Sequence, residues 1–587
     1  MEAMTAYIDR AHGAEIPRQD FSRRFNLPTA ASVIEAFEQT VSSHPHNGYT
    51  FQDARGNDVF FKFPRLAEEV TQCAAYLTHI GGLSKGDRAL LITEQPQGFV
   101  IAFLACFKLG VIPVPLANAD YLRSESDRER LLEVIKLCQP AAIICDENML
   151  ESLQAAVTVN HLDMQICLAS AKSSLPVNYP AIGADDTAYL QLTSGTTSAV
   201  KAVIATHRSL ISNSIGIMGA TGLQLDTEKD VAVTWLPLFH DMGVIGFLIC
   251  TIVRGLNTVF MPTKRFLRRP SCWLEALVKY RANISYGPNF SFLLIDRLVK
   301  EEELAKFDLR HVKAIGCGAE PIDPRLMRRF SEKLHKLARL PLSAVKPSYG
   351  LAENTLCATM TPIEESFHTV SIDDEIYRTQ GLVVETCKSP TALEVIACGK
   401  PIVNSVVAVV DHDRRPLGPG KKGEIAVSGN SVARGYYNNS ADTQAVFADG
   451  WHYTGDVGFV QRGYLFVTGR KKDLIIFNGK NYAPHEIEWC VEQIDGIRKG
   501  SVIAFPIPGE THERIGLLIG CRDYVGADLD NDVKRRVFNQ LKLPVDIVIA
   551  VAPKDIPKTS SGKLKRNLVK QRFQDGFYNN LLRSSHE

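Results

Sequence analysis

Helical and strand-like patterns alternate along this chain from Ser32 onward, and this alternation restricts its fold more than any other feature. Apolar residues recur at helical spacing over 65–80, and a short apolar strand follows over 88–93. A helix-like segment over 98–109 and strand-like segments over 111–116 and 141–145 continue the rhythm. Such alternation is typical of parallel sheets covered by helices, so we expect the α/β class.

The length of 587 residues predicts at least two domains, because a single hydrophobic core rarely extends over so long a chain. After Cys398 the pattern changes to short strands broken by Gly and Pro. The segment 468–488 combines charge, Gly and Pro and is the best candidate for a hinge. The predicted parts are a large N-terminal domain over 1–469, a β-rich subdomain within it over about 398–469, and a small mobile α/β lid over 470–587. Within the lid the predicted elements are helices over 487–494 and 530–541 and strands over 501–505 and 515–519.

Composition excludes several classes of function. Apolar residues at 45% and charged residues at 22% are typical of a soluble globular protein, and a formal charge of +1 argues against a nucleic-acid partner. Thirteen cysteines without a C-x-x-C pair predict reduced, mostly buried thiols. The N-terminus has no apolar core like that of a signal peptide, and the longest apolar run, 243–253, is too short to span a bilayer. We therefore expect a cytoplasmic protein with no transmembrane segment.

Two polar segments carry the clearest chemistry. The segment 192–202, LTSGTTSAVKA, offers hydroxyls, a flexible glycine and a lysine, which suit a loop that wraps phosphates. It is not a Walker loop, its S-x-x-K match over 198–201 lacks the expected K-T-G partner, and an ordinary Ser/Thr turn remains an alternative. The second segment, 557–566, reads PKTSSGKLKR and offers Lys563, a lysine able to reach the same phosphates.

Further short motifs lie between these two segments. They read WLPLFHDMGVIG over 235–246, GAEP over 318–321, YGLAE over 349–353, YTGDVG over 453–458 and TGRKKD over 468–473. Each is weak alone, but their order along the chain resembles that of the adenylate-forming superfamily, the enzymes that couple a carboxylic acid to AMP. The resemblance implies ATP as a substrate and Mg²⁺ as a cofactor.

The same resemblance implies roles for individual residues. His240 would position the acid beside the nucleotide, although a core or turn histidine is the commoner alternative. Glu353, with Thr197, would hold Mg²⁺, although a lone Glu there is more often a helix cap, and Lys563 would act at the reacting phosphate. Lys472 occupies the hinge position of the family. The residues implied in nucleotide binding are Thr193, Ser194, Gly195, Thr196, Thr197, Lys201, Gly318, Ala319, Glu320, Pro321, Tyr349 (stacked on the base), Gly350, and Asp456 and Arg470 (at the ribose).

Some stretches point to one branch of the superfamily. GPNF over 287–290 and GKNYAPHEIE over 479–488 resemble fatty acyl-AMP ligases, and the extra segment at about 367–396 resembles the insertion that distinguishes them from acyl-CoA synthetases. In that family the insertion is thought to limit hinge motion or thiol access. The phosphate segment departs from the family pattern, because Ser198, Val200 and Ala202 replace the expected Gly, Pro and Gly. We expect weaker ATP binding than in a typical member.

The acceptor of the acyl group follows from the resemblance alone. Acyl-AMP ligases pass it to the phosphopantetheine thiol of an acyl carrier protein, which is expected to act in trans because no carrier segment follows Arg566. A basic cluster of Lys563, Lys565, Arg566, Lys570 and Arg572 suits an acidic carrier protein, although a solvated helix face is the commoner explanation of such a cluster. The alternatives are a fatty acyl-CoA synthetase, an amino-acid adenylation enzyme that lacks its usual acid-recognising aspartate, and an ATP-binding scaffold with weakened catalysis.

Overall fold

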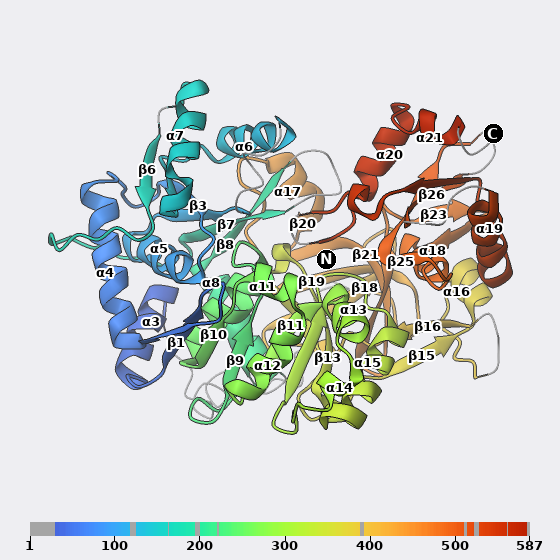
Figure 1. Ribbon diagram of the computed structural model, residues 1–587, viewed down its shortest axis with the longest axis horizontal. Helices are drawn as coiled ribbons and strands as arrows, with labels where there is room; N and C mark the ends of the chain where they lie inside the picture. The colour runs from blue at the N-terminus through green and yellow to red at the C-terminus, as the bar shows by residue number, and fades with distance from the viewer. Residues whose placement is uncertain are drawn as a thin grey trace.

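The structure is a computed structural model that describes residues 30–117, 125–162, 164–193, 200–219, 222–387, 392–509, 513–521, 527–559 and 562–583. Ser194, Gly195, Thr196 and Thr197 of the predicted phosphate loop lie outside these residues. The α/β class is confirmed, with several sheets, a β-rich subdomain and a small C-terminal part (Figure 1).

The largest sheet has nine strands in the order β17-β14-β13-β12-β11-β9-β10-β1-β2. Its six central strands run parallel, while β2 at one edge and β14 and β17 at the other pair antiparallel. Their bounds are β1 Gly48–Gln52, β2 Asp58–Lys62, β9 Val231–Thr234, β10 Asn257–Phe260, β11 Ile284–Pro288, β12 Ala314–Gly318, β13 Val345–Gly350, β14 Cys357–Met360 and β17 Lys400–Pro401. Because the central strands are parallel, their carboxyl ends meet at one edge of the sheet.

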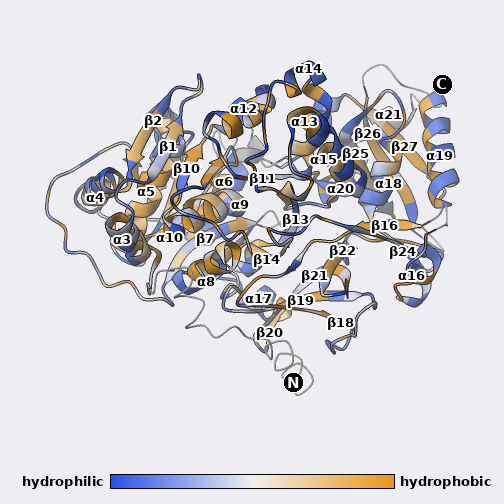
Figure 2. Ribbon diagram, turned by 90° about the horizontal axis from the view of Figure 1, so that it is seen from below, coloured by the Kyte–Doolittle hydropathy of each residue, from blue (hydrophilic) through white to orange (hydrophobic). Residues whose placement is uncertain are grey.

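Helices cover both faces of this sheet and bury its core (Figure 1). Helix α15 shows why they form: Asp323 caps its N-terminus, Pro324 takes the first position, and Leu326, Phe330 and Leu334 face inward. The helices of this domain are α3 Val33–Ser43, α4 Phe63–His79, α8 His207–Met218, α9 Asp241–Gly243, the π-helix η3 Val244–Ile249, α10 Cys250–Arg254, α11 Thr263–Arg268, α12 Ser271–Lys279, α13 Asn289–Leu298, α14 Glu301–Leu304 and α15 Pro324–Ala338, with 3₁₀ turns η4 Leu342–Ala344 and η5 Ala352–Asn354. Figure 2 shows the hydrophobic residues gathered on strands such as β1 and β10. The apolar run over 243–253 is buried core within η3 and α10.

A second, four-stranded parallel sheet packs beside the first, in the order β4-β3-β5-β6. Its helix α5 begins with Pro96 and ends at Gly110, where φ is +69° and glycine is favoured. An antiparallel pair, β7-β8, lies next to this sheet, and Thr193 and Lys201 at its open end belong to the predicted phosphate segment. The bounds are β3 Arg88–Ile92, α5 Pro96–Leu109, β4 Ile112–Pro115, α6 Glu125–Cys138, β5 Ala142–Cys145, η2 Glu147–Met149, α7 Leu150–Val159, β6 Gln165–Leu168, β7 Thr187–Thr193 and β8 Lys201–Thr206. The helices and strands predicted for 65–145 are confirmed, with shifts of one or two residues.

The β-rich part is a five-stranded antiparallel sheet with its own small core. It consists of β18 Ser405–Val410, β19 Gly423–Gly429, β20 Phe447–Ala448, β21 Trp451–Gln461 and β22 Tyr464–Arg470, with helix α17 Ser440–Val446. The predicted insertion forms a separate hairpin beside it, made of β15 Thr369–Ile372, helix α16 Asp374–Gln380 and β16 Leu393–Ile396.

The C-terminal part has a three-stranded sheet, β25-β26-β27, with apolar clusters on both faces. Its helix α18 begins at Pro484 and ends at Val491, so the prediction of 487–494 was wrong at both ends. Pro484 at the first position and the Glu486 side chain, which accepts a hydrogen bond from Ala483 N at 3.0 Å, fix the earlier start. The bounds are β23 Ile475–Phe477, β24 Lys480–Tyr482, α18 Pro484–Val491, β25 Ile497–Ile507, β26 Arg514–Cys521, α19 Ala527–Leu541, β27 Ile547–Val551, η6 Pro553–Asp555, α20 Arg566–Gln574 and α21 Asn579–Arg583.

Two further observations concern the cysteines and the length of the apolar helices. Among the described residues no two cysteines form a disulfide, and Cys387 is the exposed one. None of the helices described here is both long and apolar enough to cross a membrane.

Candidate active site

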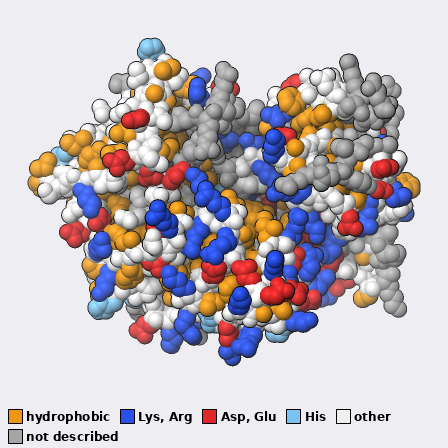
Figure 3. All heavy atoms as spheres, viewed as in Figure 1, with side chains coloured by type: hydrophobic (Ala, Val, Ile, Leu, Met, Phe, Trp, Pro, Cys, Tyr) orange, Lys and Arg blue, Asp and Glu red, His pale blue; other side chains and the backbone are white. Residues whose placement is uncertain are grey.

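A cavity of about 1830 Å³ opens between the large domain and the C-terminal part. Its wall includes the carboxyl ends of β12 and β13, the end of β22, and residues within 553–559 and 563–572. Figure 3 shows the molecule hollowed at the top, between the lobe of α7 and the lobe of α20 and α21. The carboxyl edge of parallel strands is where α/β proteins bind ligands.

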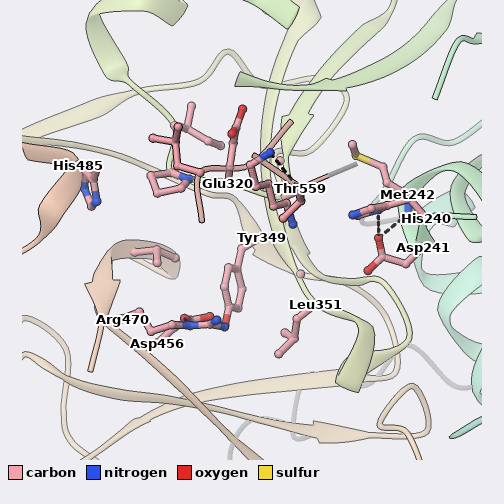
Figure 4. Close-up of a pocket in the computed structure, with 18 of the residues that line it drawn as sticks. His240, Asp241, Met242, Glu320, Tyr349, Leu351, Asp456, Arg470, His485 and Thr559 are labelled. Atoms are coloured by element: carbon pink, nitrogen blue, oxygen red, sulfur yellow. Dashed lines mark hydrogen bonds and ion pairs between the residues drawn. The ribbon is translucent and has the colours of Figure 1, made fainter. Parts of the chain in front are cut away.

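One wall of the cavity joins Tyr349, Asp456 and Arg470. Tyr349 Oη donates a hydrogen bond to Asp456 Oδ2 at 2.8 Å, and Arg470 Nε donates to Asp456 Oδ1 at 2.8 Å. Figure 4 shows the carboxylate and the guanidinium side by side below the Tyr349 ring. The charge of Asp456 raises the pKa of Arg470. This effect is larger than that of the burial of Arg470, which lowers the pKa. The structure thus brings together the three residues assigned to base and ribose.

The GAEP segment forms a neighbouring wall. Gly318 ends β12, and Ala319 has a positive φ of +70°, which turns the chain sharply after the strand. Glu320 Oε1 accepts a hydrogen bond from Phe290 N at 2.7 Å. Burial raises the pKa of Glu320, while that hydrogen bond and the charges of Lys563 and Arg566 oppose the rise. Pro321 lines the cavity after this turn, and Gly350 is required nearby because a Cβ there would lie 1.8 Å from Leu356 O.

His240 and Asp241 lie across the cavity from Arg470 (Figure 4). His240 Nδ1 and Asp241 Oδ1 are 2.5 Å apart. Burial opposes ionisation of Asp241, but His240 and, at longer range, Lys563 outweigh it and lower its pKa. The pair therefore places a stabilised carboxylate and an imidazole beside the space that Lys563 enters.

Lys563 reaches the cavity on a tight loop of the C-terminal part. Thr559 N donates to Lys563 O at 2.7 Å, and Lys563 N donates to Thr559 Oγ1 at 3.0 Å. Arg566, three residues on, forms an ion pair with Glu488 on α18 at 2.6 Å. Lys563 lies close enough to act electrostatically on both Asp241 and Glu320. Arg566 is thus paired with a carboxylate of its own part of the molecule, and the role of the other four residues of the basic cluster stays a prediction.

The phosphate side is arranged differently. Thr193 lines the cavity, but Lys201 Nζ forms an ion pair with Asp442 Oδ2 at 2.7 Å and lies 4.9 Å from the centre of the Tyr436 ring. Glu353, on the turn η5, accepts a hydrogen bond from Tyr436 Oη on its Oε1 at 2.8 Å. The sequence analysis missed Tyr436 and Asp442, because only long-range pairing brings their segment next to β8.

The cavity continues into an apolar part. Leu223, Leu225 and Leu256 line it, together with Met218 of α8 and Phe247 of the π-helix η3. The segments 211–218 and 244–252 therefore contribute both core residues and part of this wall. An apolar space that continues from a polar nucleotide-sized site suits an acid with a hydrocarbon chain.

Comparisons with known proteins agree with this geometry. The family model of the AMP-binding enzymes matches residues 37–437. The chain belongs to the AMP-binding enzyme family. It is 32% identical to a putative acyl-CoA synthetase of Caulobacter vibrioides, over 88% of this chain and 91% of the relative. It is 31% identical to the medium-chain-fatty-acid–[acyl-carrier-protein] ligase JamA of Moorena producens, over 84% and 87% of the two chains.

A solved structure is also similar to this AMP-binding enzyme. It comes from a study of fatty acyl-adenylate ligases of E. coli and L. pneumophila, with a TM-score of 0.86 and 31% identity over 94% of this chain and 99% of the other. The resemblance to adenylate-forming enzymes, and within them to fatty acyl-AMP ligases, is therefore confirmed.

In this AMP-binding enzyme the segment predicted to be an insertion bridges the two parts of the molecule. Arg378 on α16 is 7% exposed; its Nη1 donates to Asn481 O at 2.6 Å, and its Nη2 is bonded to Glu486 of α18. Lys480 adds an ion pair with Glu375 at 2.5 Å. Lys472, the predicted hinge, is exposed in the turn that follows β22, and its role stays a prediction.

Proposed function

We propose that the protein uses ATP to convert a fatty acid to its acyl-adenylate, with release of pyrophosphate, and then passes the acyl group to the phosphopantetheine thiol of an acyl carrier protein. The observation that carries this proposal is the single cavity that joins an apolar arm to the cluster of Tyr349, Asp456 and Arg470. Lys563 lines the same cavity and lies near enough to Asp241 to lower the pKa of that carboxyl.

In the first step a carboxylate oxygen of the acid forms a bond to the α-phosphorus, and the bond from that phosphorus to the bridging oxygen of pyrophosphate breaks. Two anions have to approach each other, so positive charge at their meeting point lowers the barrier. Lys563 supplies that charge. His240, held by Asp241 at 2.5 Å, is placed to orient the carboxylate.

The nucleotide is held by the residues that the sequence analysis named. Tyr349 forms the wall for the base, with Gly318, Ala319, Glu320, Pro321 and Gly350 around it, and Asp456 and Arg470 lie at the ribose. Thr193 and Lys201 serve the phosphates, together with Ser194, Gly195, Thr196 and Thr197, which lie outside the described residues. A carboxylate has about four acceptor positions, so Asp456 is able to bind ribose hydroxyls without releasing Arg470.

Glu353 fits the role of magnesium ligand. Its carboxylate lines the cavity on the phosphate side, and carboxylate oxygens are ligands that Mg²⁺ prefers. The hydrogen bond from Tyr436 fixes its orientation. When bound, the ion neutralises charge on the phosphates; Thr197, outside the described residues, is the second proposed ligand.

The names of the relatives give different acceptors for the acyl group. JamA is named for transfer to a carrier protein, whereas the Caulobacter relative is named as a putative acyl-CoA synthetase. The carrier protein is favoured by the insertion, because Arg378 ties α16 to α18 and restrains the motion that would open the site to CoA. Lys472 is the proposed hinge for the motion of the C-terminal part that these contacts still allow.

The test is pyrophosphate release from ATP and Mg²⁺ with a panel of fatty acids, followed by mass spectrometry of the acyl product. Phosphopantetheinylated carrier protein and CoA are added in separate reactions. We expect acyl-adenylate to accumulate with CoA and acyl-carrier to form with the carrier protein. Acyl-CoA as the main product would contradict the proposed acceptor, and no pyrophosphate with any acid would favour the scaffold with weakened catalysis.

A further inference from the structure

The segment 433–443 folds over both charged groups of the phosphate side. Ile204 N donates to Gly435 O at 2.9 Å and Tyr437 N donates to Ala202 O at 2.8 Å, so the segment lies antiparallel beside β8, next to Lys201. Ala433 N also donates to Glu353 O at 2.9 Å. One short stretch of chain therefore contacts the β8 lysine and the turn that bears Glu353.

Tyr436 links these two groups through its side chain. The ring is 8% exposed, and its hydroxyl donates to Glu353 Oε1 at 2.8 Å. Lys201 Nζ lies over the same ring, 4.9 Å from its centre, within the range of a cation–π contact. The phenol thus fixes one oxygen of the Glu353 carboxylate. Because the group is planar, this also sets the direction of its second oxygen.

Asp442 holds Lys201 by charge. Asn439 holds Asp442 by two hydrogen bonds: Asn439 Nδ2 donates to the carboxylate oxygen Asp442 Oδ2 at 2.9 Å, and the backbone Asp442 N donates to Asn439 Oδ1 at 3.0 Å. The Asp442 side chain is 43% exposed and the Lys201 side chain 18%. An ion pair so open to water is weak, and the phosphates of ATP carry more charge than one carboxylate.

We propose that Tyr436 and Asp442 are positioning residues of opposite effect: Tyr436 orients Glu353 for Mg²⁺, and Asp442 occupies Lys201 until the triphosphate of ATP replaces it. This inference rests on the proposed function, because it assigns Glu353 to the metal and Lys201 to the phosphates. It adds a competition within the site: ATP must displace Asp442 to gain Lys201, and the fixed charge of Asp442 also repels the phosphates.

The first test measures ATP binding by isothermal titration calorimetry without fatty acid, in EDTA and then in Mg²⁺. In EDTA, Asp442→Asn is expected to bind ATP about threefold more tightly than the wild type, because removal of a competing surface charge has a small effect. Asp449→Asn, at an exposed aspartate of the same subdomain, is the matched control and is expected to leave the ATP dissociation constant unchanged.

The second test uses Tyr436→Phe, which removes the hydroxyl and keeps the ring over Lys201. Affinity in EDTA is expected to stay within twofold of the wild type, while the Mg²⁺ concentration that half-saturates ATP binding and pyrophosphate release rises about fivefold, the effect of one lost charge-assisted hydrogen bond. The matched control is Tyr437→Phe, whose ring packs against the core of the four-stranded sheet. Thermal unfolding of every variant checks the fold.

Asp442→Asn is expected to bind ATP more tightly, whereas Tyr436→Phe is expected to need more Mg²⁺. These opposite effects distinguish positioning residues from residues that only support the fold. Weaker ATP binding in both variants, or variants that match their controls, would overturn the inference while fatty-acid-dependent pyrophosphate release by the wild type leaves the proposed function intact. A wild type that binds ATP but releases no pyrophosphate with any acid would contradict the proposed function, and the binding measurements would still decide the inference.

Discussion

The two ends of the proposed nucleotide site, which we assign to the base and ribose and to the phosphates, are held together in different ways. On the base and ribose side, Asp456 accepts hydrogen bonds from Tyr349 and Arg470 at 2.8 Å, and its side chain is 13% exposed. On the phosphate side, Lys201 is paired with Asp442, whose side chain is 43% exposed. The first arrangement is able to accept a nucleotide without losing its bonds, whereas the second has to exchange a partner.

This difference indicates that the two sides of the site contribute to nucleotide binding in different ways. Bonds that already exist before binding cost little reorganisation, so the base and ribose side is expected to set which nucleotide enters. The phosphate side exchanges an internal anion for an external one, so its contribution depends on Mg²⁺ and on the charge of the ligand. Three substitutions test this division.

The largest effect is expected at Lys563, which we propose to act between the nucleotide and the carboxylate of the fatty acid. Lys563→Ala should slow acyl-adenylate formation by about a hundredfold, because a single preorganised charge at the reacting centre contributes on the order of 3 kcal/mol. Transfer from added acyl-adenylate to the carrier protein should persist, as measured by mass spectrometry of the acylated carrier. Equal loss of both half-reactions would contradict the assignment of Lys563 to the first step.

An intermediate effect is expected on the base and ribose side. Asp456→Ala leaves the Arg470 guanidinium and the Tyr349 hydroxyl without their shared partner and should weaken binding by about 2 kcal/mol, roughly thirtyfold. Because the ribose is common to both ligands, calorimetry should find the same loss for ATP and for AMP. A loss confined to ATP would place Asp456 at the phosphates instead.

The smallest effect is expected on the phosphate side. Lys201→Met should weaken ATP binding by about 1 kcal/mol, roughly fivefold, because the gain from the phosphates is reduced by the pair with Asp442 that is given up. AMP, which lacks the β- and γ-phosphates, should bind Lys201→Met and wild type alike in the same calorimeter. Equal weakening of AMP would remove the distinction between the two sides.

Much of the large-scale organisation could be predicted from the sequence, because it rests on local patterns. The alternation over 65–145 predicted α4, β3, α5, β4 and β5, and the change of texture after Cys398 predicted a β-rich subdomain, which the structure shows as an antiparallel sheet. Tyr349 and Asp456 are 107 residues apart, yet the motif order assigned both to the nucleotide, and the structure joins them directly.

What the sequence analysis missed depends on contacts between distant segments. Tyr436 and Asp442 belong to no local pattern, and their meaning appears only when 434–437 pairs with β8. The bonds of Arg378 with Asn481 and Glu486 likewise span about a hundred residues. The early start of α18 follows from Pro484, a local signal that was present but outweighed by the apolar residues after it.

The central claim is the formation of an acyl-adenylate, and fatty-acid-dependent exchange of labelled pyrophosphate into ATP tests it most directly. The reaction needs no acceptor, so the outcome does not depend on whether a carrier protein or CoA takes the acyl group. The account predicts exchange that requires both Mg²⁺ and a fatty acid and that falls about a hundredfold in Lys563→Ala. Exchange without any acid, or none with any fatty acid although ATP binds, would contradict it.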